Sequence, residues 1–178
     1  VQPDGQRHLR LLEELARVTD LHVYGPAEAW TFLPANYRGP IPFDGRSLVQ
    51  TLHRHGVVLA LHKLEHVEEQ TPSMRVFEGC AARCAVITEP MLPLVQRFGD
   101  ALHYLDTSLS PRQQAQRIAD IVQGYRADPT AFQRQATRAH AVFSESLSLD
   151  RLLRALLDEV AVRRARGPRP PRPQAVVP

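Results

Sequence analysis

The stretch VVLALHKLEHVEEQTPSMRVFEGCAARCAVIT, residues 57–88, decides the fold because it places a helix between two apolar strands. Residues 57–61 are continuously apolar and begin with two β-branched residues, which is typical of a strand covered on both faces. Residues 85–88, AVIT, predict a second buried strand. Between them, Thr71 and Pro72 predict a helix N-cap followed by a first-turn proline. The stretch therefore predicts a β-α-β unit.

The remaining body extends this unit on both sides. Repeating β-α units followed by helices predict an α/β fold, a Rossmann-like parallel sheet flanked by helices and followed by C-terminal helices. The helix opened by Thr71 is expected to turn Met74, Phe77, Ala81 and Cys84 inward. Short strands are expected at residues 21–25, 37–42 and 102–106, and further helices at residues 7–18, between Asp44 and Gly56, and along the apolar stripes of residues 115–125, 132–143 and 149–160.

Charge separates the body from a tail. The chain has 178 residues and a net charge of +3, but residues 163–178 hold five arginines and no acid, so removing those five charges leaves −2 for residues 1–162. Arginine and proline cannot build a core, so residues 163–178 are expected to form a disordered or polyproline-like tail after a single domain at 1–162. The tail is either solvated without a partner or a contact for nucleic acid, anionic lipid or an SH3-type groove.

Several classes are excluded by composition. No apolar run approaches the roughly 20 residues of a membrane span, and no charged-then-apolar leader marks export. Cys80 and Cys84 are the only cysteines, which excludes a disulfide scaffold and favours reduced thiols in a cytoplasmic protein. The first residue is Val, which suggests a fragment.

Residues 62–66, HKLEH, match the H-x-x-E-H order of one class of zinc peptidases. That site needs a helix, whereas the motif follows directly on a predicted strand. In an extended chain His62 and His66 would lie roughly 13 Å apart at about 3.3 Å per residue. No third carboxylate ligand stands out, so no metal site is expected.

A phosphate site is favoured instead, at the start of the helix that follows. The amides of Ser73, Met74 and Arg75 are expected near the carboxyl edge of the sheet, where a helix N-terminus attracts anions. Arg75 can add a cation, and Glu78 can accept hydrogen bonds from the two hydroxyls of a ribose. This combination suits a nucleotide diphosphate. The alternative is a simple ion pair between Arg75 and Glu78 at i,i+3 spacing.

A family resemblance supports this interpretation. PSMRVFEGCAARCAVITE, residues 72–89, resembles the R-x-F-E-A-x-A-C-G-A-P-L-I-T-D segment of GT-B glycosyltransferases, and the chain is most similar to the CgeB-like group. LHVYGP, YRGPI and VVLAL before this segment and LVQRFGDALHYLD after it follow a similar order, and RAHAVFSESLSLDRLL resembles the family's H-T-Y-x-x-R-x-x-x-L helix. The resemblance covers residues 7–160.

The resemblance implies the donor-binding, C-terminal half of a two-domain, metal-independent sugar transferase. Glu78 matches the second glutamate of the family's E-x7-E pattern, which holds the donor ribose. The helix amides would lie beside the diphosphate, the loop at residues 37–39 near the nucleobase, and Arg7 near the phosphates. The expected donor-binding residues are Arg7, Tyr37, Arg38, Gly39, Thr71, Ser73, Met74, Arg75 and Glu78.

The chain departs from the family pattern at several positions. The first glutamate of E-x7-E is Gln70, with Glu69 one place away. Arg83 replaces the glycine that usually ends the helix, and His62 replaces an asparagine. The N-terminal acceptor domain and a first strand expected before residue 7 are absent from the sequence.

The expected function is transfer of a glycosyl group from a nucleotide-diphosphate sugar to an unknown acceptor, with no cofactor other than the donor. Catalytic groups are not assigned, and the isolated chain is expected to bind without turnover. The alternative is a non-catalytic α/β interaction module that acts through its basic, proline-rich tail. No G-x-G-x-x-G follows a strand, which argues against a Rossmann dehydrogenase. Nucleic acid is not an expected partner.

Overall fold

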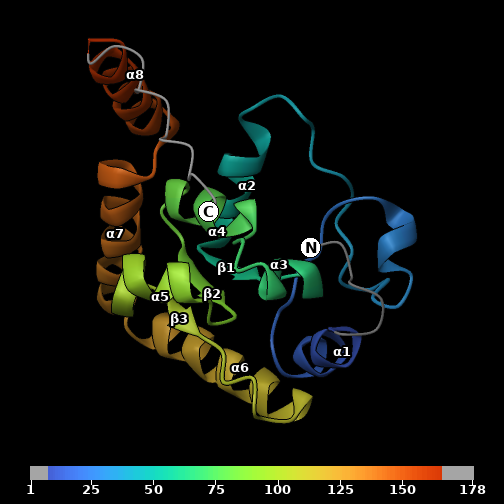
Figure 1. The fold of residues 1–178 in the computed structure, drawn as a ribbon. Helices are drawn as coiled ribbons and strands as arrows, with labels where there is room; N and C mark the ends of the chain where they lie inside the picture. Colours follow the sequence, from blue (N-terminus) through green and yellow to red (C-terminus); the bar gives the residue numbers. More distant parts are fainter. Residues whose placement is uncertain (1–7, 166–178) are drawn as a thin grey trace, which may run out of the picture. The chain divides into compact units, whose positions relative to one another are not determined.

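The computed structural model describes residues 8–165 and divides the chain into two compact units, residues 1–143 and 144–178 (Figure 1). Unit 1 contains a three-stranded parallel sheet in the order β1-β2-β3. Its strands are β1 (Val57–Ala60), β2 (Ala85–Thr88) and β3 (His103–Tyr104). A parallel sheet flanked by helices confirms the predicted α/β class.

Helices cover both faces of this sheet. On one face α2 (Ser47–His55) and α4 (Met74–Ala81) pack together and against β1. On the other face α1 (Leu9–Val18) packs along α6 (Pro111–Ala127), and their apolar side chains form one buried cluster with Ile87 of β2. Because successive strand residues point to opposite faces, Val86 faces α4 while Ile87 faces α1 and α6.

Polar side chains cap two of these helices, at Asp44 as predicted and at Ser110, which was not predicted. The Asp44 carboxylate accepts hydrogen bonds from the amides of Arg46 and Ser47 at 2.9 and 2.8 Å, and bonds to Ser47 lower its pKa to about 2. A capping box joins Ser110 and Gln113 at the start of α6. Each of these capping interactions provides a hydrogen-bond acceptor for amides that have no partner within the helix.

Two predicted strands are wrong. Residues 21–25 and 37–42 form only one isolated parallel bridge, between Val23 and Tyr37. The Val23 amide donates to Asn36 O and its carbonyl accepts from Arg38 N, both at 3.0 Å. One more bond joins the two segments, from the Gly25 amide to Gly39 O, and prolines at positions 26, 40 and 42, which have no amide hydrogen, prevent a regular ladder.

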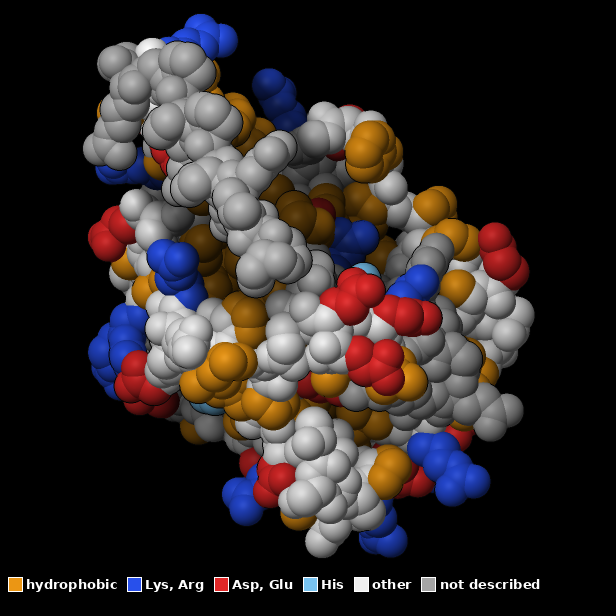
Figure 2. Space-filling view, viewed as in Figure 1, with side chains coloured by type: hydrophobic (Ala, Val, Ile, Leu, Met, Phe, Trp, Pro, Cys, Tyr) orange, Lys and Arg blue, Asp and Glu red, His pale blue; other side chains and the backbone are white. Residues whose placement is uncertain are grey.

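The segment 64–68 is helical, which corrects the expectation of an extended chain after β1. Three residues separate β1 from helix α3 (Leu64–Glu68). Figure 2 shows acidic side chains gathered over α3, which come from Glu65, Glu68 and Glu69. The structure also contains α5 (Leu92–Phe98) and the 3-10 turns η1 (Ala27–Trp30) and η2 (Gly99–Ala101), which the sequence analysis did not assign.

The three expected C-terminal helices are present as α6, α7 (Pro129–Ser146) and α8 (Leu149–Ala165). The apolar stripe of α8 is exposed at Leu149, Leu152, Leu153, Leu156 and Leu157. Helix α8 continues through residues 163–165, so these three residues of the expected tail are helical. The rest of the expected tail lies outside the described residues. Within residues 8–165, no helix is long and apolar enough to cross a bilayer.

Gly79 is the closest contact between α4 and the sheet. A Cβ at this position would lie 2.8 Å from Val86 Cγ2 and 3.4 Å from Val58 Cβ. We expect Gly79→Ala to lower the free energy of unfolding by about 1–2 kcal/mol, because overpacking against two buried valines outweighs the better helix propensity of alanine. Urea unfolding measures this change.

Gly124→Ala in α6 is the matched control, since a Cβ there meets nothing within 4 Å. That substitution is expected to raise the free energy of unfolding by about 0.5–1 kcal/mol through helix propensity alone. Equal effects of the two substitutions would contradict the close packing of α4 on β1 and β2.

Candidate functional site

Helix α4 begins at Ser73 rather than at Thr71, which corrects the predicted N-cap. Ser73 has extended backbone angles, and its Oγ accepts a hydrogen bond from the Arg75 amide at 3.3 Å. The Thr71 hydroxyl instead donates to Glu69 O at 3.4 Å. Pro72 therefore precedes the cap, and Met74, expected to point inward, is 66% exposed at the first helical position.

Gln70 holds the loop that leads into α4. Its backbone lies in the left-handed region, at φ 52°. Its side-chain oxygen accepts a hydrogen bond from the Leu92 amide at 2.8 Å, and its side-chain nitrogen donates to Val67 O at 2.7 Å. Gln70 thus joins the loop after β1 to the start of α5.

Arg75 and Glu78 form an ion pair one turn apart on α4. The Arg75 guanidinium donates to Glu78 Oε2, with the two side chains 44% and 25% exposed. This is the i,i+3 pair that the sequence left open as an alternative. A pair so exposed is worth at most about 0.5 kcal/mol to the helix, so the structure gives up little if either side chain moves to a ligand.

The same two side chains line a cavity of about 820 Å³ in unit 1. The cavity runs along the outer edge of β1, and Arg83 adds a second cation from the end of α4. Leu12, Leu15 and Ile87 line its apolar side. A concave site of this size with a few charged groups on an apolar wall is typical of small-molecule sites.

A polar cluster that the sequence analysis did not predict lines the same cavity. Tyr24 Oη lies 2.7 Å from His55 Nε2, and the His22 ring meets the His55 ring edge-on at a centroid distance of 4.9 Å. Burial, and then the neighbouring charge of His22, lower the pKa of His55. His22 and His55 lie 33 positions apart in the chain with no shared motif, so no sequence signal joins them.

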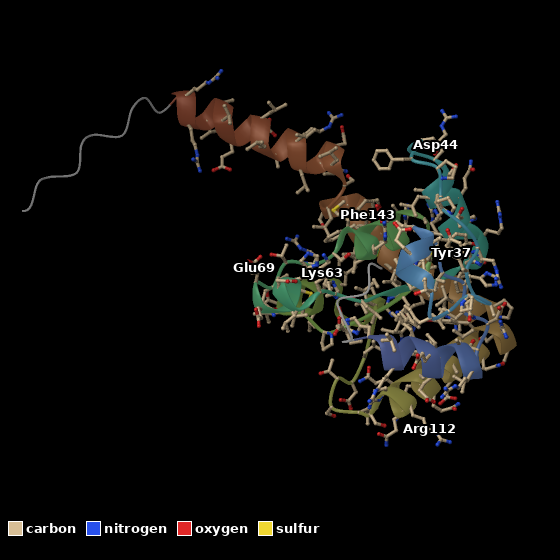
Figure 3. All side chains as sticks on the ribbon, turned by 90° about the vertical axis from the view of Figure 1, so that its right-hand side faces the viewer. Tyr37, Asp44, Lys63, Glu69, Arg112 and Phe143 are labelled. Atoms are coloured by element: carbon tan, nitrogen blue, oxygen red, sulfur yellow. The ribbon has the colours of Figure 1, made fainter. Side chains whose placement is uncertain are left out.

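The predicted nucleobase loop does not line this cavity. The Tyr37 hydroxyl donates to Gly25 O at 2.9 Å, and the Arg38 guanidinium donates to Ala35 O at 2.8 Å. Gly39 has φ 92°, and its carbonyl accepts from the Gly25 amide at 3.2 Å. In Figure 3, Tyr37 lies on the opposite side of unit 1 from Glu69. Arg7, the remaining predicted residue, lies outside the described residues.

A buried polar cluster occupies the carboxyl edge of the sheet. Glu89 follows β2, and its Oε2 accepts a hydrogen bond from the His62 amide at 2.7 Å. His8 Nε2 donates to the His62 carbonyl at 2.9 Å and lies 3.7 Å from Glu89 Oε2. All three residues are at most 5% exposed. These contacts tie the start of α1 to the ends of β1 and β2.

The H-x-x-E-H segment is not extended as predicted. His66 lies in α3 and His62 precedes its N-cap, and the centroids of their rings are 6.5 Å apart. His62 is 1% exposed and belongs to the cluster with Glu89. Among residues 8–165 there is no group of three or more histidine, cysteine or acidic residues placed to hold a metal ion.

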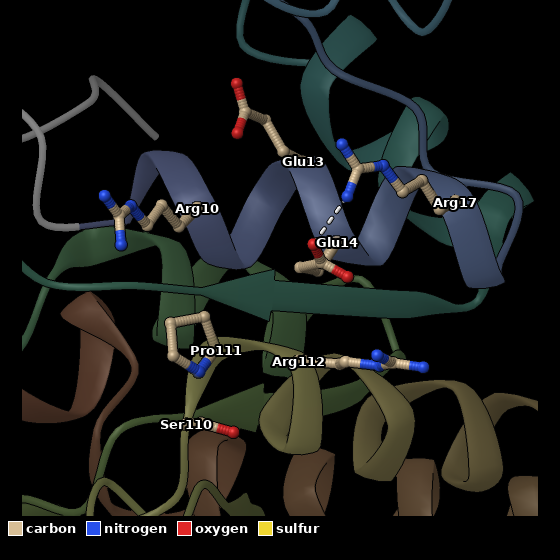
Figure 4. A pocket seen from close by; sticks show the side chains of 7 residues that line it. All are labelled: Arg10, Glu13, Glu14, Arg17, Ser110, Pro111 and Arg112. Atoms are coloured by element: carbon tan, nitrogen blue, oxygen red, sulfur yellow. Dashed lines mark hydrogen bonds and ion pairs between the residues drawn. The ribbon is translucent and has the colours of Figure 1, made fainter.

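A second groove, of about 390 Å³, lies between α1 and the start of α6 (Figure 4). Arg10, Glu13, Glu14 and Arg17 line it from α1, and Ser110, Pro111 and Arg112 from α6. Glu14 accepts a hydrogen bond from Arg17, drawn as a dashed line in Figure 4, and Glu13 points away from that pair. The groove is a charged surface and contains none of the predicted site residues.

The parallel sheet and its covering helices define an α/β domain, and a cavity lined by charged and apolar side chains lies beside α4. The chain belongs to the glycosyl transferase-like family, which it matches over residues 7–158. Glycosyl transfer is therefore the general activity of its family. No curated protein and no solved structure shows a significant match to the chain.

The two cysteines lie in α4 and directly before β2. Cys80 and Cys84 are both free and fully buried, and burial raises the pKa of each thiol to about 12. The thiolate is the reactive form, so at pH 8 we expect almost no labelling of the native protein by a disulfide reagent such as Ellman's reagent. In urea both thiols should react within minutes. Rapid labelling of either cysteine without denaturant would show that α4 is loosely packed.

Arg83 carries backbone strain at the end of α4. Its φ is 56°, a left-handed conformation that disfavours side chains with a Cβ, and it stands where the resemblance has glycine. We expect Arg83→Gly to raise the free energy of unfolding by about 1 kcal/mol, as measured by urea unfolding. Arg83→Lys, which keeps the Cβ and the charge, should leave stability unchanged. A loss of stability in Arg83→Gly would indicate that the arginine side chain itself stabilises the helix end.

Proposed function

We propose that the chain is the donor-binding part of a glycosyltransferase and that the cavity beside α4 takes a nucleotide-diphosphate sugar. The observation that carries this proposal is that Arg75 and Glu78 line one cavity of about 820 Å³ in a chain of the glycosyl transferase-like family. The volume lies within the roughly 300–1,000 Å³ typical of small-molecule sites.

The two charged groups would take different parts of the donor. Arg75 would leave Glu78 to contact the diphosphate, because a guanidinium matches phosphate oxygens with paired N–H donors. Glu78 would then accept hydrogen bonds from the two ribose hydroxyls. Thr71, Ser73 and Met74 do not line the cavity, so the positive end of the α4 dipole would act on the donor only from a distance, and the Arg75 amide already bonds to Ser73 Oγ.

The chemistry in this proposal is stabilisation of the leaving nucleotide diphosphate by cationic side chains and helix amides, with neither a metal nor a further cofactor. Such charge stabilisation lowers the barrier because the negative charge on the leaving group grows as the glycosidic bond breaks. Glu78 orients the donor and is not proposed as a base. The acceptor and the catalytic groups would come from an N-terminal acceptor domain outside this chain, in a cytoplasmic enzyme.

Titration with UDP and GDP by isothermal calorimetry tests the site. We expect saturable binding of one of them and a 10- to 100-fold weaker affinity in Glu78→Gln, since hydrogen bonds to a charged group contribute about 1.5–3 kcal/mol. Glu14→Gln is the matched control, because Glu14 also pairs with an arginine three residues away but lies in the other groove. That variant should bind as the parent chain does.

Two outcomes would contradict the proposal. One is the absence of binding to either nucleotide at millimolar concentration. The other is an equal loss of affinity in the two glutamine variants, which would indicate a general charge effect. Deleting residues 166–178 distinguishes the proposed function from the alternative. Nucleotide binding by residues 1–165 should stay unchanged, whereas an interaction module that acts through its tail would lose its partner.

A further inference from the structure

Helix α8 carries an exposed apolar surface. The helix belongs to the second compact unit, residues 144–178. Its large apolar side chains lie on one face and form what we call the α8 stripe: Leu149, Leu152, Leu153, Leu156, Leu157 and Val160. All five leucines are exposed. A contiguous apolar surface of this kind marks a site of interaction with another molecule.

The α8 stripe has a symmetric spacing along the helix. Its six positions follow one another at intervals of 3, 1, 3, 1 and 3 residues, so the stripe reads the same from either end. When two copies of α8 run antiparallel about a two-fold axis, Leu153 of one copy meets Leu156 of the other, and Leu149 meets Val160. A two-fold dimer needs a surface that is complementary to itself. The α8 stripe meets this requirement in the antiparallel arrangement.

The charges at the two ends of α8 favour the antiparallel arrangement over the parallel one. Asp150 lies in the first turn, and Arg163 and Arg164 lie in the last turn. Antiparallel copies place the arginine end of one helix beside the acidic end of the other and oppose the two helix dipoles. A parallel pair would bring the arginines of both copies together, which is repulsive.

The charge balance of α8 also favours a second copy over a lipid surface. Residues 149–165 hold four arginines and three acids, so their net charge is 4 − 3 = +1. Two of these arginines already pair with acids one turn away, Arg154 with Asp150 and Arg163 with Glu159. Helices that lie on anionic lipid are instead rich in Lys and Arg on their polar face. The mixed signs on α8 suit contact with another helix of mixed charge.

We propose that α8 is a dimerisation helix through which two copies of the chain associate, antiparallel and about a two-fold axis. The α8 stripes of the two copies would form the apolar centre of the contact, and the charged side chains would border it. Most helical stability in proteins comes from packing of an amphipathic face. The second copy would therefore stabilise α8 itself. This proposal rests on the second unit and does not depend on nucleotide binding by the first.

Sedimentation equilibrium of the 178-residue chain tests the contact. We expect a reversible monomer–dimer equilibrium, and at least about 100-fold weaker association in Leu153→Glu, because a two-fold dimer would bury the new charge twice. Val162→Glu is the matched control. Val162 is as exposed as Leu153, at 48%, but lies two residues beyond Val160 and so faces away from the stripe. That variant should associate as the parent chain does.

Disulfide formation under a glutathione buffer tests the orientation. We expect the double variant Leu149→Cys/Val160→Cys to form a covalent dimer, since an antiparallel pair places these two positions opposite each other. Leu149→Cys alone should stay unlinked. The native cysteines are both buried and do not compete. Efficient linkage of Leu149→Cys alone would overturn the antiparallel arrangement.

Three outcomes overturn the dimer. One is a chain that stays monomeric at millimolar concentration, which would mean that the stripe is covered by other parts of its own chain or by a different partner. Another is a dimer that Leu153→Glu leaves unchanged while circular dichroism shows that its helices are kept. The third is a chain that stays monomeric in solution and sediments with vesicles of phosphatidylserine and phosphatidylcholine, with this binding lost in Leu153→Glu, which would assign the stripe to a lipid surface.

Discussion

The packing of α4 against β1 and β2 is the contact on which the rest of unit 1 depends. Gly79 lets the helix backbone approach Val58 and Val86 without an intervening side chain. That approach fixes which way the helix faces, so that Val76 and Cys80 are buried while Arg75 and Glu78, on the remaining surface, reach the cavity. α2 is held to the same assembly, since the His53 ring bonds to Ala82 O at 2.9 Å. Local packing of one glycine thus determines where the charged groups lie.

Elements set by local signals could be predicted from the sequence. The strands at residues 57–60 and 85–88 follow from continuous apolar runs. Helix α2 follows from the capping residue Asp44 and a 3.6-residue period, and α6 from its apolar stripe alone. The segment after β1 could not be predicted, because the chain leaves the strand where His62 meets Glu89, a residue 27 positions away. An apolar run cannot reveal such a distant partner. The same reason hides the contact between Tyr24 and His55.

The candidate site was partly accessible from the sequence. Spacing alone places Arg75 and Glu78 on one face of a helix, and the structure adds that this face borders a cavity and that the two groups neutralise each other. The helix start moved two residues, from Thr71 to Ser73, because either hydroxyl is a good cap and only the turn at Gln70 decides between them. The nucleobase loop at residues 37–39 is used for internal bonds, and its assignment to the donor stays a prediction.

Gln70 ties together two loops that leave the same edge of the sheet, since one side chain bonds both to Val67 in its own loop and to Leu92 at the start of α5. Any displacement of the segment before α4 breaks a bond at α5 as well. The two loops are therefore coupled through the Gln70 side chain. A ligand that shifts the loop before α4 would also disturb the start of α5 at Leu92, without contacting α5 itself.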